Sequence, residues 1–576
     1  MPPIVNFRTA RENCPECGKK LKVQKTDTKI IYSLHIGKVI AHQTFLHCDS
    51  CTCSDVYFSE ELNNLVPKHC NFSYDVLVYV GRAVFQRYRT GYEVIQELAE
   101  LNVPISNSEV NYLAQKFIVY LAVAHRNISD KIRDCMWMKG GYILHIDGTS
   151  DGGSPHLIST LDELSQFVLA NIKIPSENAT QIVVLLQEIK DKYGTPSAIV
   201  TDMGKAMLGA IAEIFPEVLV YICHFHFLRD IGKDLLEKPY AIIRNNLKKY
   251  SISKQLRYRL RQYSKTNLQE LDAKLDEIIY TQEIHQELDE TKARALCYTL
   301  IAYALDGKNQ GAGFGFPFDR THLVFYQRLC AIYNTLENIG QDCIIDSKAR
   351  KIHQALSNDL QALIQDLEVR EAAESLKQKT EVFDNLREAM QIALTDSKKG
   401  LNDNGTEVNI KTIEHKIKEF KNRLTGKETY KNDKDYQKMV KQIDKYWDKL
   451  FADPITLNTP TETITVQPQR TNNLMEQFFR GFKRAYRRTS GNNSMSKKLQ
   501  SMIADTPLVK NLDNQEYIEI LLDGKKSLEE VFAEIECRII QEEIKKANEK
   551  EFKIPPKIRK IIKTENVPVL FQNLSG

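Results

Sequence analysis

Two aspartates follow apolar segments that the sequence marks as β-strands. Asp147 ends the segment Leu-His-Ile-Asp, and Asp202 ends the segment Ala-Ile-Val-Thr-Asp. Aspartate is also a common turn residue, so either position alone has an ordinary structural explanation. If the two strands are neighbours, the carboxylates repel each other, and a hard cation such as Mg²⁺ or Mn²⁺ relieves that repulsion. The pair therefore indicates a metal site, with Asp151 as the alternative ligand to Asp147.

A third acid, Glu476, opens a segment whose two helical faces differ in character. At about 100° per residue, three basic residues of this segment fall within about 40° of Glu476. A solvated charged face is the ordinary explanation, but one glutamate ahead of four or more cations is not an i,i+4 salt-bridge pattern. The pattern favours a metal-binding acid beside a cationic track for DNA phosphates. The basic residues are Arg480, Lys483, Arg484, Arg487 and Arg488, and the opposite, core-packing face is Leu474, Phe478, Phe482 and Ala485.

The elements expected around the two aspartates follow one order along residues 136–228. Three β-rich segments come first (GYILHID, HLIST and SQFVLANIKI), then an amphipathic helix ended by Gly194. A buried strand, a second helix and a fifth strand follow (PSAIVTD, GKAMLGAIAEIF and EVLVYIC). Three strands before the first helix argue against a dinucleotide-binding layout, and no G-x-G-x-x-G follows a strand. The order βββαβαβ resembles the ribonuclease H-like fold, in which the first and fourth strands lie side by side.

Five of the 12 cysteines lie within the first 53 residues, and four of them form two C-x2-C pairs. Four thiolates supply the closed tetrahedral site that structural Zn²⁺ prefers. Residues 1–70 are therefore expected to form a zinc ribbon whose folding depends on the metal. Unligated buried cysteines are the alternative. The expected ligands are Cys14, Cys17, Cys48 and Cys51, and the residues that could substitute for them are His47, Cys53, His69 and Cys70.

Residues 71–135 are expected to be helical. Three segments carry apolar residues at helical spacing, with Gly91 opening the second and Ser106 or Ser108 placed to cap the third. A supporting helix followed by a helix, a short turn and a helix is the outline of a helix-turn-helix DNA-binding domain. Any small three-helix bundle has the same outline, and the neighbouring zinc ribbon is what favours DNA binding.

The rest of the chain divides where its pattern changes. Residues 229–468 are expected to form a large all-helical insertion domain, and residues 469–505 return to the core with the helix of Glu476. Residues 506–576 are expected to be a helical, charged C-terminal tail. The expected fold class is multidomain α/β plus all-α. A ribonuclease H-like mixed sheet is interrupted by the insertion and preceded by the zinc ribbon and the helix-turn-helix domain.

Composition bounds the class of protein without identifying it. The chain has 79 Lys and Arg against 75 Asp and Glu, so its net charge of +4 does not by itself argue for a nucleic-acid partner. No apolar run approaches the roughly 20 residues that span a bilayer, and the first residues lack the apolar core of a secretory signal. We therefore expect a cytoplasmic protein with no membrane partner.

Taken in order, these motifs resemble the DDE-type insertion-sequence transposases, particularly the Mutator-like branch and its bacterial relatives. Members share a ribonuclease H-like core, an Asp after the first strand, an Asp after the fourth and a helical insertion before a Glu. A C-x2-H motif often follows the second Asp, and here it is formed by Cys223 and His226. The N-x2-E context of the glutamate is formed by Asn473 and Glu476. The resemblance covers about residues 1–500.

The resemblance implies a DNA transposase that binds transposon terminal inverted repeats, cleaves a strand with water and transfers the freed 3′-hydroxyl. Asp147, Asp202 and Glu476 would hold two Mg²⁺ or Mn²⁺ ions, the arrangement of two-metal phosphoryl transfer. The partner would be double-stranded DNA, both as transposon ends and as target. A homodimer or higher oligomer would pair two ends on the DNA. The expected setting is the nucleoid of a prokaryotic cytoplasm.

Five further residues keep open roles. Cys223 and His226 make half a zinc site, so a structural or substrate-contact role stands beside metal binding. His224 and Arg229 are close enough in sequence to contact phosphate. Trp447 could stack on a flipped base, with a plain core tryptophan as the simpler interpretation.

Three other classes of protein compete with a transposase. A domesticated, non-transposing DNA-binding protein would be marked by loss of one acid, and none is lost here. A ribonuclease H-like junction nuclease is usually compact, without a zinc ribbon or a large helical insertion. A zinc-dependent hydrolase is the weakest alternative, because the core contains no H-E-x-x-H or comparable cluster.

Overall fold

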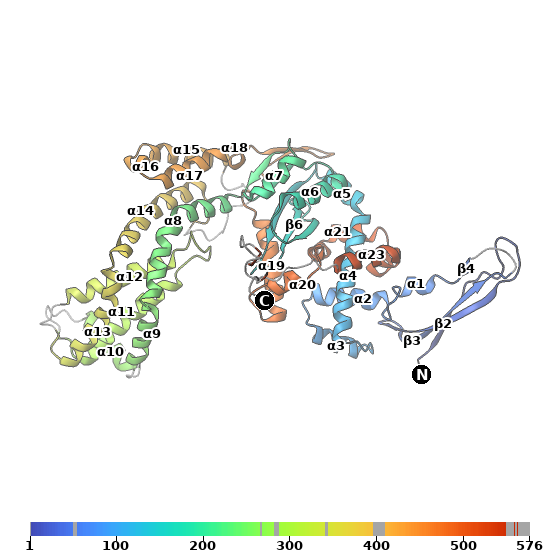
Figure 1. Cartoon of the computed structure of the whole chain (residues 1–576), viewed down its shortest axis with the longest axis horizontal. Coiled ribbons are helices and arrows are strands. Elements are labelled where there is room, and N and C mark those ends of the chain that lie inside the picture. Colours follow the sequence, from blue (N-terminus) through green and yellow to red (C-terminus); the bar gives the residue numbers. More distant parts are fainter. Residues whose placement is uncertain are drawn as a thin grey trace, which may run out of the picture.

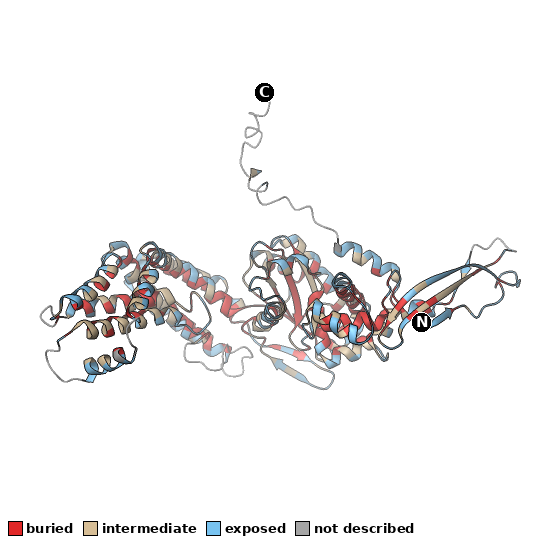
Figure 2. Ribbon diagram, turned by 90° about the horizontal axis from the view of Figure 1, so that it is seen from below, coloured by how far each residue is buried: buried red, intermediate tan, exposed pale blue. Residues whose placement is uncertain are grey.

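The structure, a computed structural model, describes residues 2–49, 55–264, 268–280, 287–339, 344–394, 409–548, 558 and 561–562. The molecule is elongated, with a β-hairpin arm at one end, a sheet surrounded by helices in the middle and a helical domain at the other end (Figure 1). Buried residues gather inside the middle part and inside the helical domain (Figure 2). The chain is therefore mixed α/β, with one core in the middle and a second in the helical domain.

The arm is a long antiparallel hairpin with one packed end and one exposed end. Ile31 and Val39, next to the turn, are buried in the main core, whereas the first seven residues of the leading strand are exposed. The turn end is further fixed by Asp75, which accepts hydrogen bonds from the Ser33 hydroxyl and the Leu34 N–H. The strands are β1 (Ile4–Phe7), which pairs with β3 in parallel, β2 (Lys22–Ser33), β3 (Gly37–His47) and β4 (Val56–Tyr57).

The helices after the arm share the main core with the sheet. Capping boxes start two of them, so Ser106 rather than Ser108 caps α4. The second half of α4 is buried without interruption over residues 116–125, so this helix runs through the core and not along its surface. The helices are α1 (Glu61–Leu65), α2 (Tyr74–Phe85), α3 (Gly91–Glu100), α4 (Asn107–Asn127) and α5 (Ser129–Met138).

A five-stranded mixed sheet forms the centre of the molecule, in the order β7-β6-β5-β8-β9. β5, β6 and β7 form an antiparallel meander, and β8 and β9 extend the sheet in parallel to β5. Gly194, with a φ of 81°, ends the helix after β7 as expected. The elements are β5 (Ile143–Thr149), β6 (His156–Asp162), β7 (Val168–Ile174), α6 (Ala179–Tyr193), β8 (Ala198–Thr201), α7 (Lys205–Ile214) and β9 (Val220–Ile222).

The helical domain is inserted between β9 and the last part of the sheet domain. Its first helix, α8 (His224–Lys249), starts directly at the sheet and links the two cores. The other elements are α9 (Ile252–Tyr263), α10 (Leu268–Tyr280), α11 (Glu290–Asp306), η1 (Gly307–Asn309), α12 (Thr321–Asn338), α13 (Ser347–Ile364), α14 (Leu367–Met390), α15 (Ile410–Thr425), α16 (Glu428–Asn432), α17 (Lys434–Lys445) and α18 (Trp447–Leu450).

The segment 229–468 is not all-helical, because it ends in a two-stranded antiparallel hairpin. β10 (Ile455–Asn458) and β11 (Thr463–Val466) pair, and Ile455 and Leu457 pack against residues of the sheet. Their alternating β-branched and apolar residues (ITLN and TITV) are typical of strands. This hairpin leads the chain back from the insertion to the sheet.

The C-terminal elements are part of the main core as far as residue 540, which differs from the expected charged tail. Tyr517 and Phe532 are completely buried, and the Tyr517 hydroxyl is 2.8 Å from His125 Nδ1. Asn511 exchanges two hydrogen bonds with the backbone of Val168 in β7. The elements are α19 (Asn473–Ser490), α20 (Ser496–Ser501), η3 (Thr506–Asp513), α21 (Gln515–Leu522), α22 (Leu528–Ala533) and α23 (Cys537–Asn548).

None of the described helices combines the length and the apolar character that crossing a bilayer requires.

Candidate functional site

Asp147 and Asp202 come from neighbouring strands at the same level of the sheet. β5 and β8 pair in parallel, and the last pair in their register is His145 with Val200. Each aspartate lies two residues beyond that pair. Asp147 stands within β5, which continues to Thr149, and Asp202 directly follows β8. The sheet thus brings these two acids together.

Burial makes Asp147 an unusual carboxyl group. It is 8% exposed, and its Oδ1 accepts a 2.8 Å hydrogen bond from the Gly148 N–H. Burial is the largest cause that raises its pKa, to about 8, and the charges of Asp202 and then Glu476 add to the rise. The Gly148 N–H and Arg229 act in the opposite direction. At neutral pH the metal-free protein therefore keeps a proton on Asp147.

Glu476 lies in the first turn of α19, and its charge acts on Asp147. Burial raises the pKa of Glu476, while Arg229 and Arg480 oppose the rise. The Nε2 atom of His226 is 3.7 Å from Glu476 Oε1. Burial lowers the pKa of His226 to about 3, with Arg229 as the next cause, so this imidazole is neutral at pH 7. At that distance it is a close neighbour of the carboxylate and not a cation paired with it.

The three carboxylates gather less tightly than the cysteines of the arm. Among the described residues, Cys14, Cys17 and Cys48 are the one group of three whose candidate ligand atoms all lie within 4.8 Å of one another. Like charges repel, and each aspartate accepts a hydrogen bond from a nearby backbone N–H, Asp147 from Gly148 and Asp202 from Gly204, each at 2.8 Å. The site therefore consists of three acids in which the charges of Asp202 and Glu476 act on Asp147, without a compact ligand cage.

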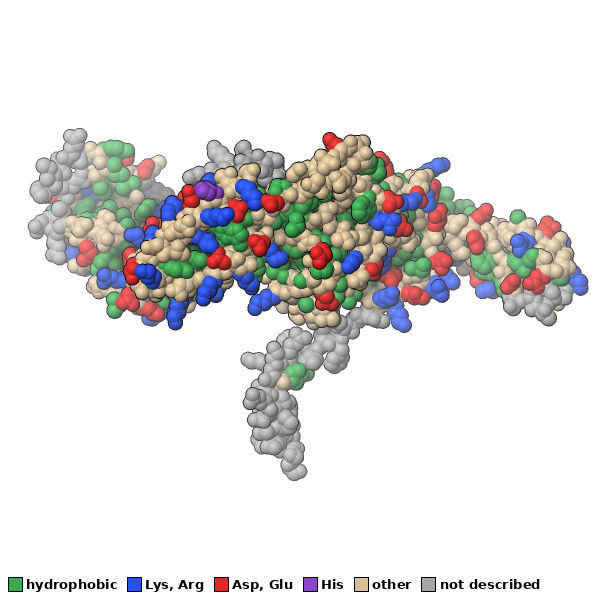
Figure 3. Space-filling model, turned by 90° about the horizontal axis from the view of Figure 1, so that it is seen from above, with side chains coloured by type: hydrophobic (Ala, Val, Ile, Leu, Met, Phe, Trp, Pro, Cys, Tyr) green, Lys and Arg blue, Asp and Glu red, His purple; other side chains and the backbone are tan. Residues whose placement is uncertain are grey.

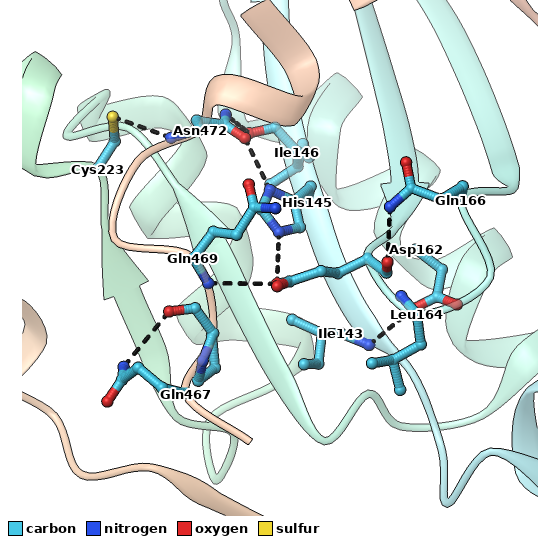
Figure 4. A network of polar contacts seen from close by, with 12 residues as sticks. Ile143, His145, Ile146, Asp162, Leu164, Gln166, Cys223, Gln467, Gln469 and Asn472 are labelled. Atoms are coloured by element: carbon cyan, nitrogen blue, oxygen red, sulfur yellow. Dashed lines mark hydrogen bonds and ion pairs between the residues drawn. The ribbon is translucent and has the colours of Figure 1, made fainter. Parts of the chain in front are cut away.

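A buried polar network joins the start of α19 to β5 (Figure 4). His145 Nδ1 is 2.9 Å from Asn472 Oδ1, and the Asn472 amide donates to the carbonyl of Ile146 at 3.3 Å. The Asn472 N–H donates to Cys223 Sγ at 3.2 Å. On the other side of the ring, His145 Nε2 is 2.9 Å from a carboxylate oxygen of Glu163. The residue before α19 is thus tied to the strand that carries Asp147.

Sequence reasoning missed this network. Its one visible signal was a histidine, His145, at a position of β5 that is completely buried. Its partner Asn472 lies 327 residues further along the chain. Nothing local to either residue indicates that the two side chains meet.

The cysteine and histidines that follow β9 have structural surroundings. Cys223 is completely buried, and burial raises the pKa of its thiol to about 12. His224 is also buried and its Nε2 is 2.8 Å from the carbonyl of Leu450, so the expected phosphate contact of His224 is wrong. Arg229 is half-buried and acts electrostatically on Asp147 and Glu476. Of the pair His224 and Arg229, only Arg229 is shown to act electrostatically on the acids.

Asp151 and Trp447 are engaged elsewhere. The carboxylate of Asp151 accepts a 2.7 Å hydrogen bond from the Met495 N–H, which ties the loop after α19 to the end of β5. The Trp447 indole N–H donates to Glu414 at 3.2 Å, and its ring packs against Phe451 and under Lys421. Trp447 is therefore a packed residue of the insertion.

The basic residues of α19 are exposed, as their spacing predicted. Arg480, Lys483, Arg484, Arg487 and Arg488 all have exposed side chains. Within the described part of the chain, none of these five residues forms an ion pair. The opposite face is only partly packed. Phe478 is buried, but Leu474 and Phe482 also border a cavity of about 650 Å³ shared with α2 and η3.

The cysteine cluster lies at the exposed end of the arm. The first pair forms a tight knuckle, in which the Gly18 N–H donates to the Cys14 carbonyl at 2.9 Å. Cys17 Sγ and Cys48 Sγ are 3.5 Å apart. Tetrahedral zinc with bonds of about 2.3 Å needs sulfur atoms roughly 3.8 Å apart. Three thiols at this spacing could hold a metal ion.

The remaining candidate ligands of this cluster are Cys51, Cys53, His47, Cys70 and His69. Cys51 and Cys53 lie outside the described residues. His47 pairs with Asp49, and Cys70 is buried in the main core, so neither belongs to the cluster. The backbone of His69 has a φ of 60°.

No protein-family model matches the sequence, and no curated protein matches it.

Proposed function

We propose that the chain is a DDE-type DNA transposase whose catalytic acids are Asp147, Asp202 and Glu476. The observation that carries the proposal is their convergence. Two adjacent parallel strands and the first turn of α19 supply one acid each, and the charges of Asp202 and Glu476 act on Asp147. The sheet order β7-β6-β5-β8-β9, with the meander first and the parallel strands after it, supports a ribonuclease H-like core.

In this proposal the three acids hold two Mg²⁺ or Mn²⁺ ions. Hard divalent ions suit oxygen ligands, and burial makes this carboxylate cluster costly without compensating positive charge. When bound, such ions activate the attacking oxygen and stabilise the leaving one. Arg229 supplies part of the compensation from the protein itself. Neutral His226 borders Glu476 without competing for its charge.

The DNA path follows the exposed stripe of α19. Its arginines and lysine begin one turn after Glu476, so a backbone phosphate at the acids continues along the helix face. We assign binding of the transposon-end duplex to the arm and to α4. The first half of α4 exposes polar side chains at Asn107, Ser108 and Asn111, and recognition helices commonly contact base edges at their start.

Two further parts of the proposal concern zinc and assembly. Structural Zn²⁺ is assigned to Cys14, Cys17 and Cys48 with Cys51 as the fourth ligand, because sulfur-only sites at this spacing are typical of zinc. Pairing of two transposon ends calls for a homodimer or higher oligomer on the DNA. The protein would then work at the nucleoid of a prokaryotic cell.

The decisive experiment is an excision assay in cells that carry the DNA segment encoding this chain with its flanking sequence. Asp202→Ala and Glu476→Gln should each lower excision on the order of a thousand-fold, since each removes several kcal/mol of transition-state stabilisation. Glu519→Gln, an exposed glutamate on α21, is the matched control and should excise normally. Normal excision by either acid variant would overturn the catalytic assignment. Duplex binding without excision by the unaltered chain would identify a DNA-binding protein instead.

A further inference from the structure

A hollow of about 490 Å³ lies in the helical insertion, far from the three acids in the sequence. It is formed where α8 ends and α9 begins, and η1 and the first turn of α12 complete its wall. No aspartate or glutamate is among its lining residues. The polar groups that line it include Arg244, Lys248, Ser253, Lys254, Lys308 and His322.

Positive charge is concentrated in this hollow. Burial lowers the pKa of Lys308, and Arg257 on α9 lowers it further. The pKa of His322 is lowered by burial and then by Lys308 and Arg244. The cations are thus close enough to repel one another. Arg244 also lies 3.4 Å from Glu237, but this pair is exposed to solvent and therefore weak.

Two side chains of the hollow are held ready to donate hydrogen bonds. The Lys308 ammonium donates to the Ser253 hydroxyl at 2.8 Å and lies 5.2 Å from the ring centre of Phe325. These contacts fix its position and leave further N–H groups of the ammonium for a ligand. His322 Nδ1 is buried and has no hydrogen-bond partner in the described part of the chain. A buried polar atom of this kind is costly unless something binds it.

The start of α9 adds a third favourable feature. This helix of 12 residues begins after Ser251, whose φ of 53° places it in the left-handed region. No side chain caps its first turn. The partial positive charge of a helix N-terminus therefore faces the same hollow as the lysines.

The distance between the hollow and the acids matches the repeat of duplex DNA. α8 connects the two places, from His226 beside Glu476 to Lys248 in the hollow. At 1.5 Å per residue, this part of the helix is at most about 33 Å long, because Pro239 lies within it. Phosphates return to the same face of B-DNA after one turn of about 34 Å. On the face seen in Figure 3, Lys and Arg side chains lie over the insertion together with Asp and Glu side chains.

We propose that this hollow binds a backbone phosphate of the DNA duplex, about one helical turn away from the phosphate at the catalytic acids. The inference rests on the proposed function, because it uses the acids as the second point of contact. A phosphate oxygen can accept from Lys308 and His322 while its charge relieves the repulsion among Arg244, Lys248 and Lys254. A free phosphate compound offers the same chemistry and is distinguished by experiment.

The test measures binding of the full chain to a 30-base-pair duplex of arbitrary sequence by fluorescence anisotropy at several salt concentrations. Lys254→Gln and Lys308→Gln should each weaken binding about three- to ten-fold near 0.1 M salt. The slope of log affinity against log salt should fall by about 0.9 for one lost phosphate contact. Lys238→Gln, an exposed lysine on α8 outside the hollow, is the matched control. Lys254 is exposed, so its variant keeps the test valid if loss of Lys308 disturbs folding.

The outcomes separate this inference from the proposed function. If the unaltered chain binds the duplex and both variants match Lys238→Gln, the inference is wrong and the proposed function stands. If the unaltered chain does not bind duplex DNA, both fail. A parallel titration uses tripolyphosphate as the probe. If the variants lose tripolyphosphate affinity but keep full duplex affinity, the hollow takes a free phosphate compound and the DNA assignment is overturned.

Discussion

The two candidate metal sites differ in what holds their ligands in place. Cys14, Cys17 and Cys48 gather within 4.8 Å at the exposed end of the arm, where the described residues of the local core add Leu21, Leu46 and the partly buried Tyr57. The three acids rest on the central sheet and on α19, within the large main core. The cysteines are close together with little else to hold them. The acids are held firmly by the sheet and by α19, but their oxygen atoms do not lie as close together as the sulfur atoms of the cysteines.

This difference indicates opposite relations between metal and folding. A metal at the cysteines would supply folding free energy that the small local core cannot. At the acids, the folded state is destabilised before any metal binds, because burying three carboxylates together opposes stability. Removing the first site should therefore unfold a region, whereas neutralising the second should stabilise one.

The largest effect is expected at the cysteines. Cys14→Ser should remove the bound zinc and the protection of the exposed half of the β2–β3 hairpin against hydrogen exchange. Structural zinc sites contribute on the order of 10 kcal/mol to folding, which greatly exceeds what the local core offers. Zinc content by mass spectrometry and amide exchange of the arm are the measurements. Cys330→Ser, a half-buried cysteine on α12, is the control and should keep both. Stoichiometric zinc in Cys14→Ser would contradict the ligand set.

The second prediction is that the buried acids lower the free energy of unfolding, whereas zinc at the cysteines should raise it. The pKa of Asp147 is raised to about 8 in the folded chain, from 3.8. Between those values the folded state binds a proton that the unfolded state lacks, so the free energy of unfolding falls as pH rises. Without added Mg²⁺ or Mn²⁺, the loss should be on the order of 1 kcal/mol per pH unit between about pH 4 and 8. Urea unfolding followed by amide exchange in β5 and β8 measures it.

Asp147→Asn sharpens this second prediction, since asparagine cannot ionise. The variant should lose the pH dependence and be more stable than the unaltered chain at pH 8. Asp513→Asn, an exposed acid paired with Lys510, is the control and should keep the slope. Mg²⁺ should stabilise the unaltered chain more at pH 8 than at pH 5, because it binds the ionised carboxylates. Equal slopes for Asp147→Asn and the unaltered chain would refute the assigned cause.

Local patterns explain which parts of the molecule the sequence could predict. The succession of strands and helices around Asp147 and Asp202 and the two faces of the Glu476 helix depend on residues within a few positions of each other. The pairing of β5 with β8 joins distant segments and was expected from the resemblance to a ribonuclease H-like sheet. The hairpin of β10 and β11 carried a clear β-branched signal, but its helical surroundings concealed it. The C-terminal segment has a charged composition, and its burial depends on a core built from distant elements. Contacts across such distances have no sequence period to reveal them.

A smaller effect on excision is expected when a residue that positions the acids is replaced and the acids themselves are kept. His145→Ala removes the ring that joins Asn472 to Glu163, so Glu476 should lose its fixed place relative to Asp147. Excision should fall about 10- to 100-fold through kcat, because misplacement by about 1 Å can cost that much. Duplex affinity should stay unchanged. His156→Ala on β6 is the control. A variant that weakens DNA binding as strongly as excision would indicate general damage instead of a positioning role.

The smallest effect is expected when a single cation is replaced. The comparison is between a cation on α19 and a cation on the arm. Arg487 on α19 forms no ion pair among the described residues, whereas Lys22 on the arm pairs with Asp49 at 3.0 Å. A cation already paired at the surface gives up that pair to reach a phosphate, so its net gain from DNA is small. Arg487→Gln should weaken duplex binding about two- to three-fold and lower the salt slope by about 0.9, while Lys22→Gln should change neither measurably. An equal change of slope in both variants would show that pairing with Asp49 does not reduce the contribution of Lys22 to DNA binding.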